Sequence, residues 1–169
     1  MNEPLETQLG RLLRQKGLQL ATAESCTGGL LGHRLTNIPG SSEYYLGGVV
    51  AYANETKMAL LGVAGETLRT CGAVSRETAL EMARGAFRAL DADLAISVSG
   101  IAGPGGGLPG KPVGTTWLGL AAIDGEWARL DHFSGDREQI KAAAADSALQ
   151  LALDYLGGRL PRKAGQGGR

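Results

Sequence analysis

The sequence has 169 residues, of which 43% are hydrophobic and 20% are charged, and this balance predicts one globular domain rather than a disordered or fibrous chain. A formal net charge of zero argues against nucleic acid or an anionic membrane surface as a partner. Two cysteines and two histidines, without metal-ligand spacing, argue against a disulfide scaffold and against a metal site.

The N-terminal segment predicts a helix. Leucines recur at helical spacing from Leu5 to Leu13, and Gly17 is a stop signal. Charges run through this segment, which is unlike a signal peptide, and no apolar run approaches the length of a bilayer span. We therefore expect a cytoplasmic protein with no membrane partner.

The next segments alternate between strand and helix patterns as far as a glycine-rich loop. Asn54 is a candidate cap for a short helix, and Ser75 is a candidate N-cap for a longer one, with Glu77 well placed in its first turn. The patterns predict strands over residues 18–24, 46–53 and 92–100, helices over residues 29–38, 55–62, 65–72 and 76–91, and a loop over residues 101–112.

The C-terminal part predicts a hairpin followed by a long helix. Asp124-Gly125 is a strong signal for a tight turn between two strand-like runs. Ser134 or Asp136 would cap the helix that ends near residue 156. Early alternation followed by a hairpin predicts an α/β fold, namely a single three-layer α/β/α domain on a mixed β-sheet over residues 1–157, with a flexible tail over residues 158–169.

One glycine-rich segment imitates a nucleotide-binding motif. Gly105 to Lys111 reads GGGLPGK, which matches the front of a P-loop, but Pro112 stands where that motif needs serine or threonine. A P-loop also opens a helix, whereas the residues that follow are strand-like. We expect instead a loop at the end of the strand 92–100, at the edge where α/β sheets bind ligands.

The stretch TAESCTGG, residues 22–29, places several reactive side chains where a strand turns into a helix. Free N–H groups cluster at such a turn, and those near Thr27 and Gly28 could bind an anion or stabilise an oxyanion. Ser25 and Cys26 are the candidate nucleophiles, and either needs a base. Cys26 could instead be a small buried apolar residue, and Glu24 a charge that orders the turn.

The base is more readily found among the lysines than among the histidines. His33 lies along the helix after the turn and His132 lies in the hairpin, so a Cys26–histidine pair is the weaker alternative. Lys57 lies in the first turns of a helix, where the positive helix terminus and burial would favour the neutral amine. Residue chemistry thus suggests a Ser25–Lys57 dyad, with a solvated Lys57 as the alternative.

Several motifs in fixed order carry a family resemblance. TAESCTGG, IPGSSEYYLGGVVAYANETK, GAVS, SGIAGPGGG, KPVGT and FSGDR together resemble the CinA C-terminal domain family, the nicotinamide-nucleotide amidohydrolases. The likeness runs from about residue 22 to residue 137. Many relatives carry an additional N-terminal domain that resembles molybdopterin-binding proteins, which these 169 residues do not contain.

The resemblance implies an activity and catalytic residues. Such proteins hydrolyse the carboxamide of nicotinamide mononucleotide (NMN) to nicotinate mononucleotide and ammonia, as serine–lysine hydrolases without a metal or other cofactor. The motif serine matches Ser25, the lysine after YANET matches Lys57, and a second serine in PGSS matches Ser42, which would relay or orient the proton. Relatives also suggest a homodimer or a higher homo-oligomer.

Further residues are candidates for substrate binding beside Thr27 and Gly28. Tyr52 would stack on the pyridine ring, or else pack in the core. Arg137, at the start of the last helix, suits a phosphate, or else is a surface residue. Gly100 and Gly103 would let the backbone approach the nucleotide. The alternatives to this enzyme are a silent nucleotide-binding or protein-interaction module and an amidohydrolase for another small amide.

Overall fold

A five-stranded mixed sheet forms the centre of the computed structural model, which describes residues 3–161. The strand order is β2-β1-β3-β4-β5. Strand β1 pairs in parallel with β2 and β3, while β3–β4 and β4–β5 are antiparallel. The strands are β1 (Leu20–Glu24), β2 (Tyr45–Val50), β3 (Leu94–Gly100), β4 (Thr115–Ala122) and β5 (Gly125–His132).

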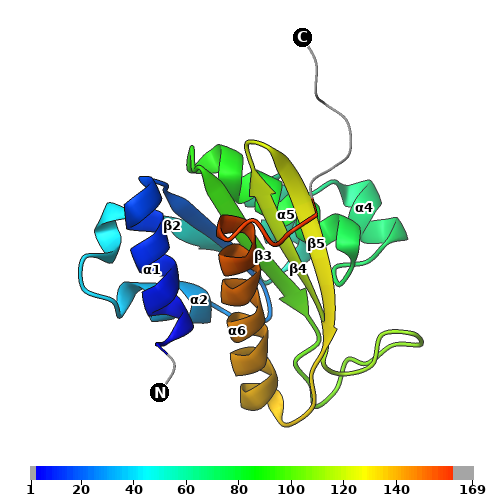
Figure 1. The fold of residues 1–169 in the computed structure, drawn as a ribbon. Coiled ribbons are helices and arrows are strands. Elements are labelled where there is room, and N and C mark those ends of the chain that lie inside the picture. Colours follow the sequence, from blue (N-terminus) through cyan, green and yellow to red (C-terminus); the bar gives the residue numbers. More distant parts are fainter. Residues whose placement is uncertain (1–2, 162–169) are drawn as a thin grey trace.

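Helices cover both faces of this sheet (Figure 1). Helices α1, α2 and α6 pack together on one face, and α3, α4 and α5 lie on the other. The helices are α1 (Leu5–Lys16), α2 (Leu30–Thr36), α3 (Asn54–Leu61), α4 (Gly65–Thr70), α5 (Arg76–Ala89) and α6 (Arg137–Leu156), and a short 3₁₀ helix spans Ser41–Glu43. The three-layer α/β/α domain on a mixed sheet, predicted from the sequence, is confirmed.

The buried side chains explain why the layers form. Strands β1 and β3 are buried on both faces, as expected of central strands between two helical layers. Aliphatic residues of α1, α2 and α6 form one core cluster with the sheet, and a smaller cluster lies under α3 and α5. Many α6 core positions are alanine, which lets this helix approach the sheet closely.

Most predicted helix termini agree with the structure. The Ser75 side chain accepts a hydrogen bond from the N–H of Thr78 and caps α5. Asp136 caps α6 in a reciprocal capping box with Gln139, so of the two candidates Asp136 is the cap. Gly17 ends α1 in the left-handed conformation.

Two local predictions are wrong. Asn54 does not cap α3, because Ala53 occupies the N-cap position and Asn54 is the first helical residue. The hairpin turn lies at Ile123 and Asp124, one residue earlier than predicted, and Gly125 already pairs with Ala122. Of the predicted C-terminal tail, residues 162–169 lie outside the described residues.

Candidate active site

A pocket opens at the carboxyl ends of the three parallel strands. Ser25 follows β1, Tyr52 follows β2, and Gly100 ends β3, so the strand directions bring these residues to one edge of the sheet. We call it the serine–lysine pocket; its volume is about 200 Å³. It is lined by Ser25, Cys26, Tyr52, Asn54, Lys57, Ala73, Val74, Ser99, Gly100, Ala102 and Arg137.

Glu24 holds the turn that presents Ser25. Its carboxylate is 2% exposed and accepts hydrogen bonds from the Thr27 hydroxyl at 2.6 Å and from the N–H groups of Gly29, Leu31 and Gly32 at 2.9–3.1 Å. A buried carboxylate at the start of α2 thus satisfies donors that the helix leaves unpaired. Glu24 therefore orders the turn, as the sequence analysis suggested.

Lys57 reaches Ser25 from the second turn of α3. Its side chain is 1% exposed, and its Nζ lies 3.0 Å from Ser25 Oγ. The same nitrogen lies 2.9 Å from the carbonyl oxygen of Ala51 and 3.0 Å from that of Tyr52. Burial lowers the pKa of Lys57, and a negative charge on the nearby Cys26 would oppose this effect only in part. The structure thus brings together the two residues of the suggested dyad.

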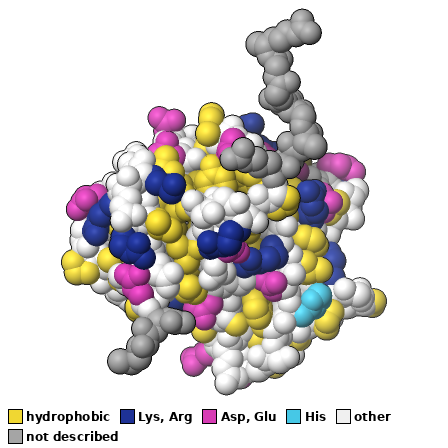
Figure 2. Space-filling view, in the orientation of Figure 1, with side chains coloured by type: hydrophobic (Ala, Val, Ile, Leu, Met, Phe, Trp, Pro, Cys, Tyr) yellow, Lys and Arg dark blue, Asp and Glu magenta, His cyan; other side chains and the backbone are white. Residues whose placement is uncertain are grey.

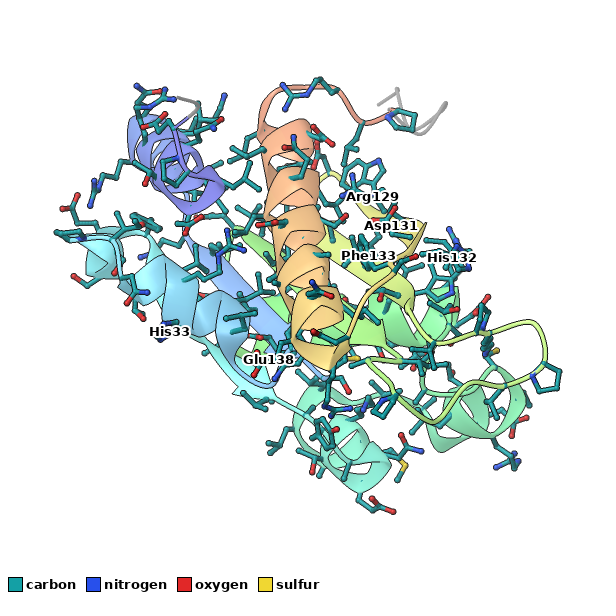
Figure 3. All side chains as sticks on the ribbon, turned by 90° about the horizontal axis from the view of Figure 1, so that it is seen from below. His33, Arg129, Asp131, His132, Phe133 and Glu138 are labelled. Carbon is teal, nitrogen blue, oxygen red and sulfur yellow. The ribbon has the colours of Figure 1, made fainter. Side chains whose placement is uncertain are left out.

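Cys26 lies beside Ser25 in a setting that disfavours its thiolate. Burial, together with the charge of Glu24, raises the pKa of Cys26 to about 11. Neither histidine lines the pocket: His33 lies on α2 and His132 on β5, on opposite sides of α6 in Figure 3. Cys26 is thus a buried thiol that pairs with neither histidine. This agrees with the alternative interpretation of Cys26 as a small buried apolar residue.

Arg137 and Tyr52 meet at the rim of the pocket. Arg137 Nη2 donates to the Tyr52 hydroxyl at 3.0 Å, and Nη1 donates to the carbonyl of Gly103 at 2.6 Å. Tyr52 is 62% exposed, which rules out the alternative interpretation that it packs in the core. Gly103 does not line the pocket, but its carbonyl holds Arg137 in place.

Gly100 lies at a point where no side chain fits. A Cβ atom there would approach Thr116 Oγ1 to 2.7 Å and Cys26 Sγ to 3.2 Å. The backbone at the end of β3 can therefore form the pocket wall, as predicted for this glycine.

Thr27 and Gly28 do not line the pocket, contrary to their predicted place in it. The Thr27 hydroxyl is buried and donates to Glu24, and the Gly28 N–H donates to the carbonyl of Ser25. Within residues 3–161, the N–H groups of Cys26 and Thr27 donate to no oxygen. These two N–H groups, and not that of Gly28, are the free donors of the turn.

Ser42 does not reach Ser25, contrary to its predicted relay role. It is exposed in the 3₁₀ helix that precedes β2. Because β1 and β2 are parallel and Leu20 pairs with Tyr45, Ser42 lies at the amino end of these strands and Ser25 at the carboxyl end. A strand of five residues separates the two ends by roughly 16 Å.

The segment that imitates a P-loop forms an irregular loop. Leu108 and Lys111 pair in an isolated bridge, β4 follows, and the Lys111 amine donates to the carbonyl of Cys71. No helix N-terminus is therefore available to cradle a phosphate after the motif, in agreement with the sequence prediction.

Several pocket residues were missed by sequence reasoning. Asn54 lines the pocket rather than capping α3. It lies one turn before Lys57 on the same face of the helix, and this spacing is the sequence signal that could have placed it there. Nothing in the sequence places Ser99 in the pocket, because alternation along β3 shows only on which face of the sheet a residue lies. Ala73 and Val74 carry no chemical signal in the sequence.

The part of the chain that the structure describes contains neither a metal-binding cluster nor a membrane-spanning helix. Residues 3–161 contain no group of three or more histidine, cysteine, aspartate and glutamate side chains that could hold a metal ion. Over the same residues, none of the helices combines the length and the apolar character needed to cross a bilayer.

Comparison with curated proteins gives relatives over most of the chain. A CinA-like protein of Chloroherpeton thalassium is 50% identical over 157 residues, which cover 90% of this chain. A CinA-like protein of Geobacter sulfurreducens is 49% identical over 92% of this chain. In both cases the match covers 37% of the relative, so the chain spans a little over a third of the length of these proteins.

Solved structures of similar length superpose closely. A competence-damaged protein (CinA) superfamily protein of Klebsiella pneumoniae has a TM-score of 0.88 at 37% identity, covering 91% of this chain and 96% of the other. A competence/damage inducible protein of Agrobacterium tumefaciens has a TM-score of 0.84 at 42% identity, covering 93% and 98%. The family model for the CinA C-terminal domain matches residues 2–156, and the chain therefore belongs to the CinA C-terminal domain family.

Proposed function

We propose that this chain is a nicotinamide-nucleotide amidohydrolase that converts NMN to nicotinate mononucleotide and ammonia. The observation that carries the proposal is the buried Lys57 amine, 3.0 Å from the Ser25 hydroxyl, at the edge of the sheet where ligands bind. A buried lysine with a lowered pKa beside a serine is the arrangement of an activated nucleophile. A module that only binds nucleotides would not need such an activated serine.

The contacts of Lys57 define how its neutral form would work. A neutral amine has two N–H groups and one lone pair, and the carbonyls of Ala51 and Tyr52 can only accept. These carbonyls therefore take both N–H groups, and the lone pair faces the third neighbour, the Ser25 hydroxyl. Neutral Lys57 is thus oriented to accept the serine proton.

The reaction then follows in two steps. Ser25 Oγ attacks the carboxamide carbon as Lys57 takes its proton, and the free N–H group of Cys26, which lines the pocket, stabilises the oxyanion. Lys57 returns the proton to the leaving nitrogen, so that ammonia departs and an acyl-enzyme remains. A water molecule, deprotonated by Lys57, attacks the ester, and Lys57 returns that proton to Ser25 Oγ as the acid is released. Ser42 takes no part in this mechanism.

The shape of the pocket suits one end of a nucleotide. Pockets that enclose a whole drug-sized ligand measure about 300–1,000 Å³. The smaller serine–lysine pocket, of about 200 Å³, would take the pyridine ring and its carboxamide, leaving the ribose phosphate at the rim. Arg137 lies at that rim and uses two of its five N–H donors on Tyr52 and Gly103, so the others remain for a phosphate.

The test is release of ammonia from NMN by the purified chain, without added metal. Ser25→Ala and Lys57→Ala should each reduce kcat/KM by at least about 10³-fold, because neither a nucleophile without its base nor a base without its nucleophile suffices. Ser42→Ala is the matched serine control, and we expect activity close to that of the wild type.

Two outcomes would contradict the proposal. Binding of NMN without ammonia release by the wild type would favour the nucleotide-binding module. Release from another small amide in a substrate panel, but not from NMN, would keep the dyad and replace the substrate.

A further inference from the structure

Two serines of β3 make the same hydrogen bond in different surroundings. The hydroxyl of Ser97 donates to the carbonyl of Ala79 at 2.6 Å, and that of Ser99 donates to the carbonyl of Ala73 at 2.6 Å. Both serines are buried. Ser99 lines the serine–lysine pocket, whereas Ser97 does not. Ser97 therefore represents the structural role of a buried strand serine, and Ser99 adds a place in the pocket wall.

The proton of Ser99 is not available to a ligand. A carbonyl oxygen accepts hydrogen bonds and cannot donate, so the hydroxyl of Ser99 must be the donor to Ala73. A hydroxyl has one proton and two acceptor lone pairs. What Ser99 can offer to a molecule in the pocket is therefore an acceptor only.

The acceptor of that proton is held in place by the start of α5. The N–H of Thr78 donates to the Ser75 side chain at 3.1 Å, and the Thr78 hydroxyl donates to the carbonyl of Gly72 at 2.7 Å. These bonds fix the backbone on both sides of Ala73. The orientation of the Ser99 hydroxyl is thus set by the fold before a ligand enters.

An oriented acceptor distinguishes the substrate of an amidohydrolase from its product. A carboxamide carries an NH₂ group with two donors, whereas the carboxylate formed from it offers only acceptors at neutral pH. We propose that Ser99 is a specificity-determining residue whose Oγ accepts a hydrogen bond from the substrate carboxamide NH₂. The proposal rests on the proposed amidohydrolase function and adds to it a preference for the amide over the acid.

The preference is expected to be large enough to measure. A site that hydrogen-bonds an N–H group of its substrate loses much of its discrimination against analogues without that group when the accepting side chain is removed. Loss of one such bond corresponds to about a tenfold change in an equilibrium constant. Lys57 would also lie near the bound carboxamide, but it is present in every variant compared, so its contribution to the preference cancels.

The experiment measures dissociation constants of NMN and nicotinate mononucleotide by calorimetry in the Ser25→Ala protein, which cannot turn the amide over. Adding Ser99→Ala should weaken NMN binding and lower the preference for amide over acid about tenfold. Ser97→Ala is the matched control: it should lower Tm by a similar amount and leave the preference unchanged. If the Ser99→Ala protein does not fold, Ser99→Cys replaces the oxygen with a weak acceptor, and the same loss is expected.

The outcomes separate this proposal from the proposed function. An unchanged preference in the Ser99 variants, with ammonia release by the wild type, would overturn the role of Ser99 alone. A preference that depends on Ser99, without ammonia release by the wild type, would overturn the enzymatic proposal and leave the recognition role. Absence of binding of either nucleotide, together with no ammonia release by the wild type, would overturn both.

Discussion

The amine of Lys57 lies among three oxygens, and its protonation state decides what each contact does. As an ammonium it donates to all three, including Ser25 Oγ, and cannot accept a proton. As a neutral amine it turns its lone pair to Ser25. The two carbonyl contacts and the burial therefore act in opposite directions, since the carbonyls stabilise the charge and burial lowers the pKa of Lys57.

The proposed activity should rise with pH. Below the lowered pKa of Lys57 the amine is protonated and idle, and above it the amine is the base, so kcat/KM for ammonia release should increase as pH rises through that pKa. Lys57→Arg should be inactive throughout, because guanidinium does not deprotonate. Lys111→Ala, which removes an amine bonded to the carbonyl of Cys71, should keep the wild-type profile. A pH-independent rate would contradict a lysine base.

Cys26 should be dispensable as a nucleophile. With a pKa of about 11 its thiol is almost fully protonated at neutral pH. Cys26→Ala should retain activity within a few-fold of the wild type, whereas Ser25→Ala should lose it. Ammonia release by the two variants under identical conditions checks this; the reverse result would identify Cys26 as the nucleophile.

At the scale of elements, the caps show how far local sequence signals reach. Ser75 was predicted as a cap, and Asp136 as one of two candidates; both act as caps, because a cap and its donor lie within one turn. For Glu24 the sequence suggested a role in ordering the turn but not its donors, because the carboxylate reaches across Ser25–Gly28 to donors up to eight residues away. These contacts depend on the path of the backbone through the turn, and the residue-spacing rules for helix caps do not describe that path.

Loss of the Glu24 carboxylate should destabilise the domain severely. Glu24→Ala leaves a buried hydroxyl and three backbone N–H groups without their acceptor, so unfolding free energy should fall by at least about 3 kcal/mol. Asp136→Ala, at an exposed cap, should cost about 1 kcal/mol. Urea denaturation of both variants compares them, and equal losses would contradict the special role of Glu24.

At the scale of the whole molecule, Arg34 joins the helices of one layer. From α2 it forms ion pairs with Glu6 of α1 at 2.8 Å and with Asp146 of α6 at 2.7 Å. On the face that carries α1 and α6, Figure 2 shows basic and acidic side chains interspersed rather than gathered by sign. This face therefore carries no extended patch of basic side chains.

The Arg34 network should make stability depend on acidity. Burial alone would raise the pKa of Glu6, but hydrogen bonds and charge from Arg34, with a bond from its own backbone, lower it. Its contribution is thus present above the unfolded-state pKa and is lost as pH falls through the lower, folded-state pKa. Arg34→Met should reduce stability at pH 7 by about 1–2 kcal/mol and less near pH 3. Urea titrations at both pH values test this, and a pH-independent loss would contradict it.

The sequence by itself determined the secondary structure and the layered fold, since periodic hydrophobicity, glycine stops and caps act within a few residues. With only two histidines in the chain, it also favoured lysine over histidine as the candidate base. Only the tertiary structure decided which side chains meet. Ser25 and Lys57 are 32 positions apart and touch, whereas Ser42, nearer in sequence, lies at the other end of the strands. Contact between distant residues depends on strand order and direction, and these follow from the packing of the whole chain.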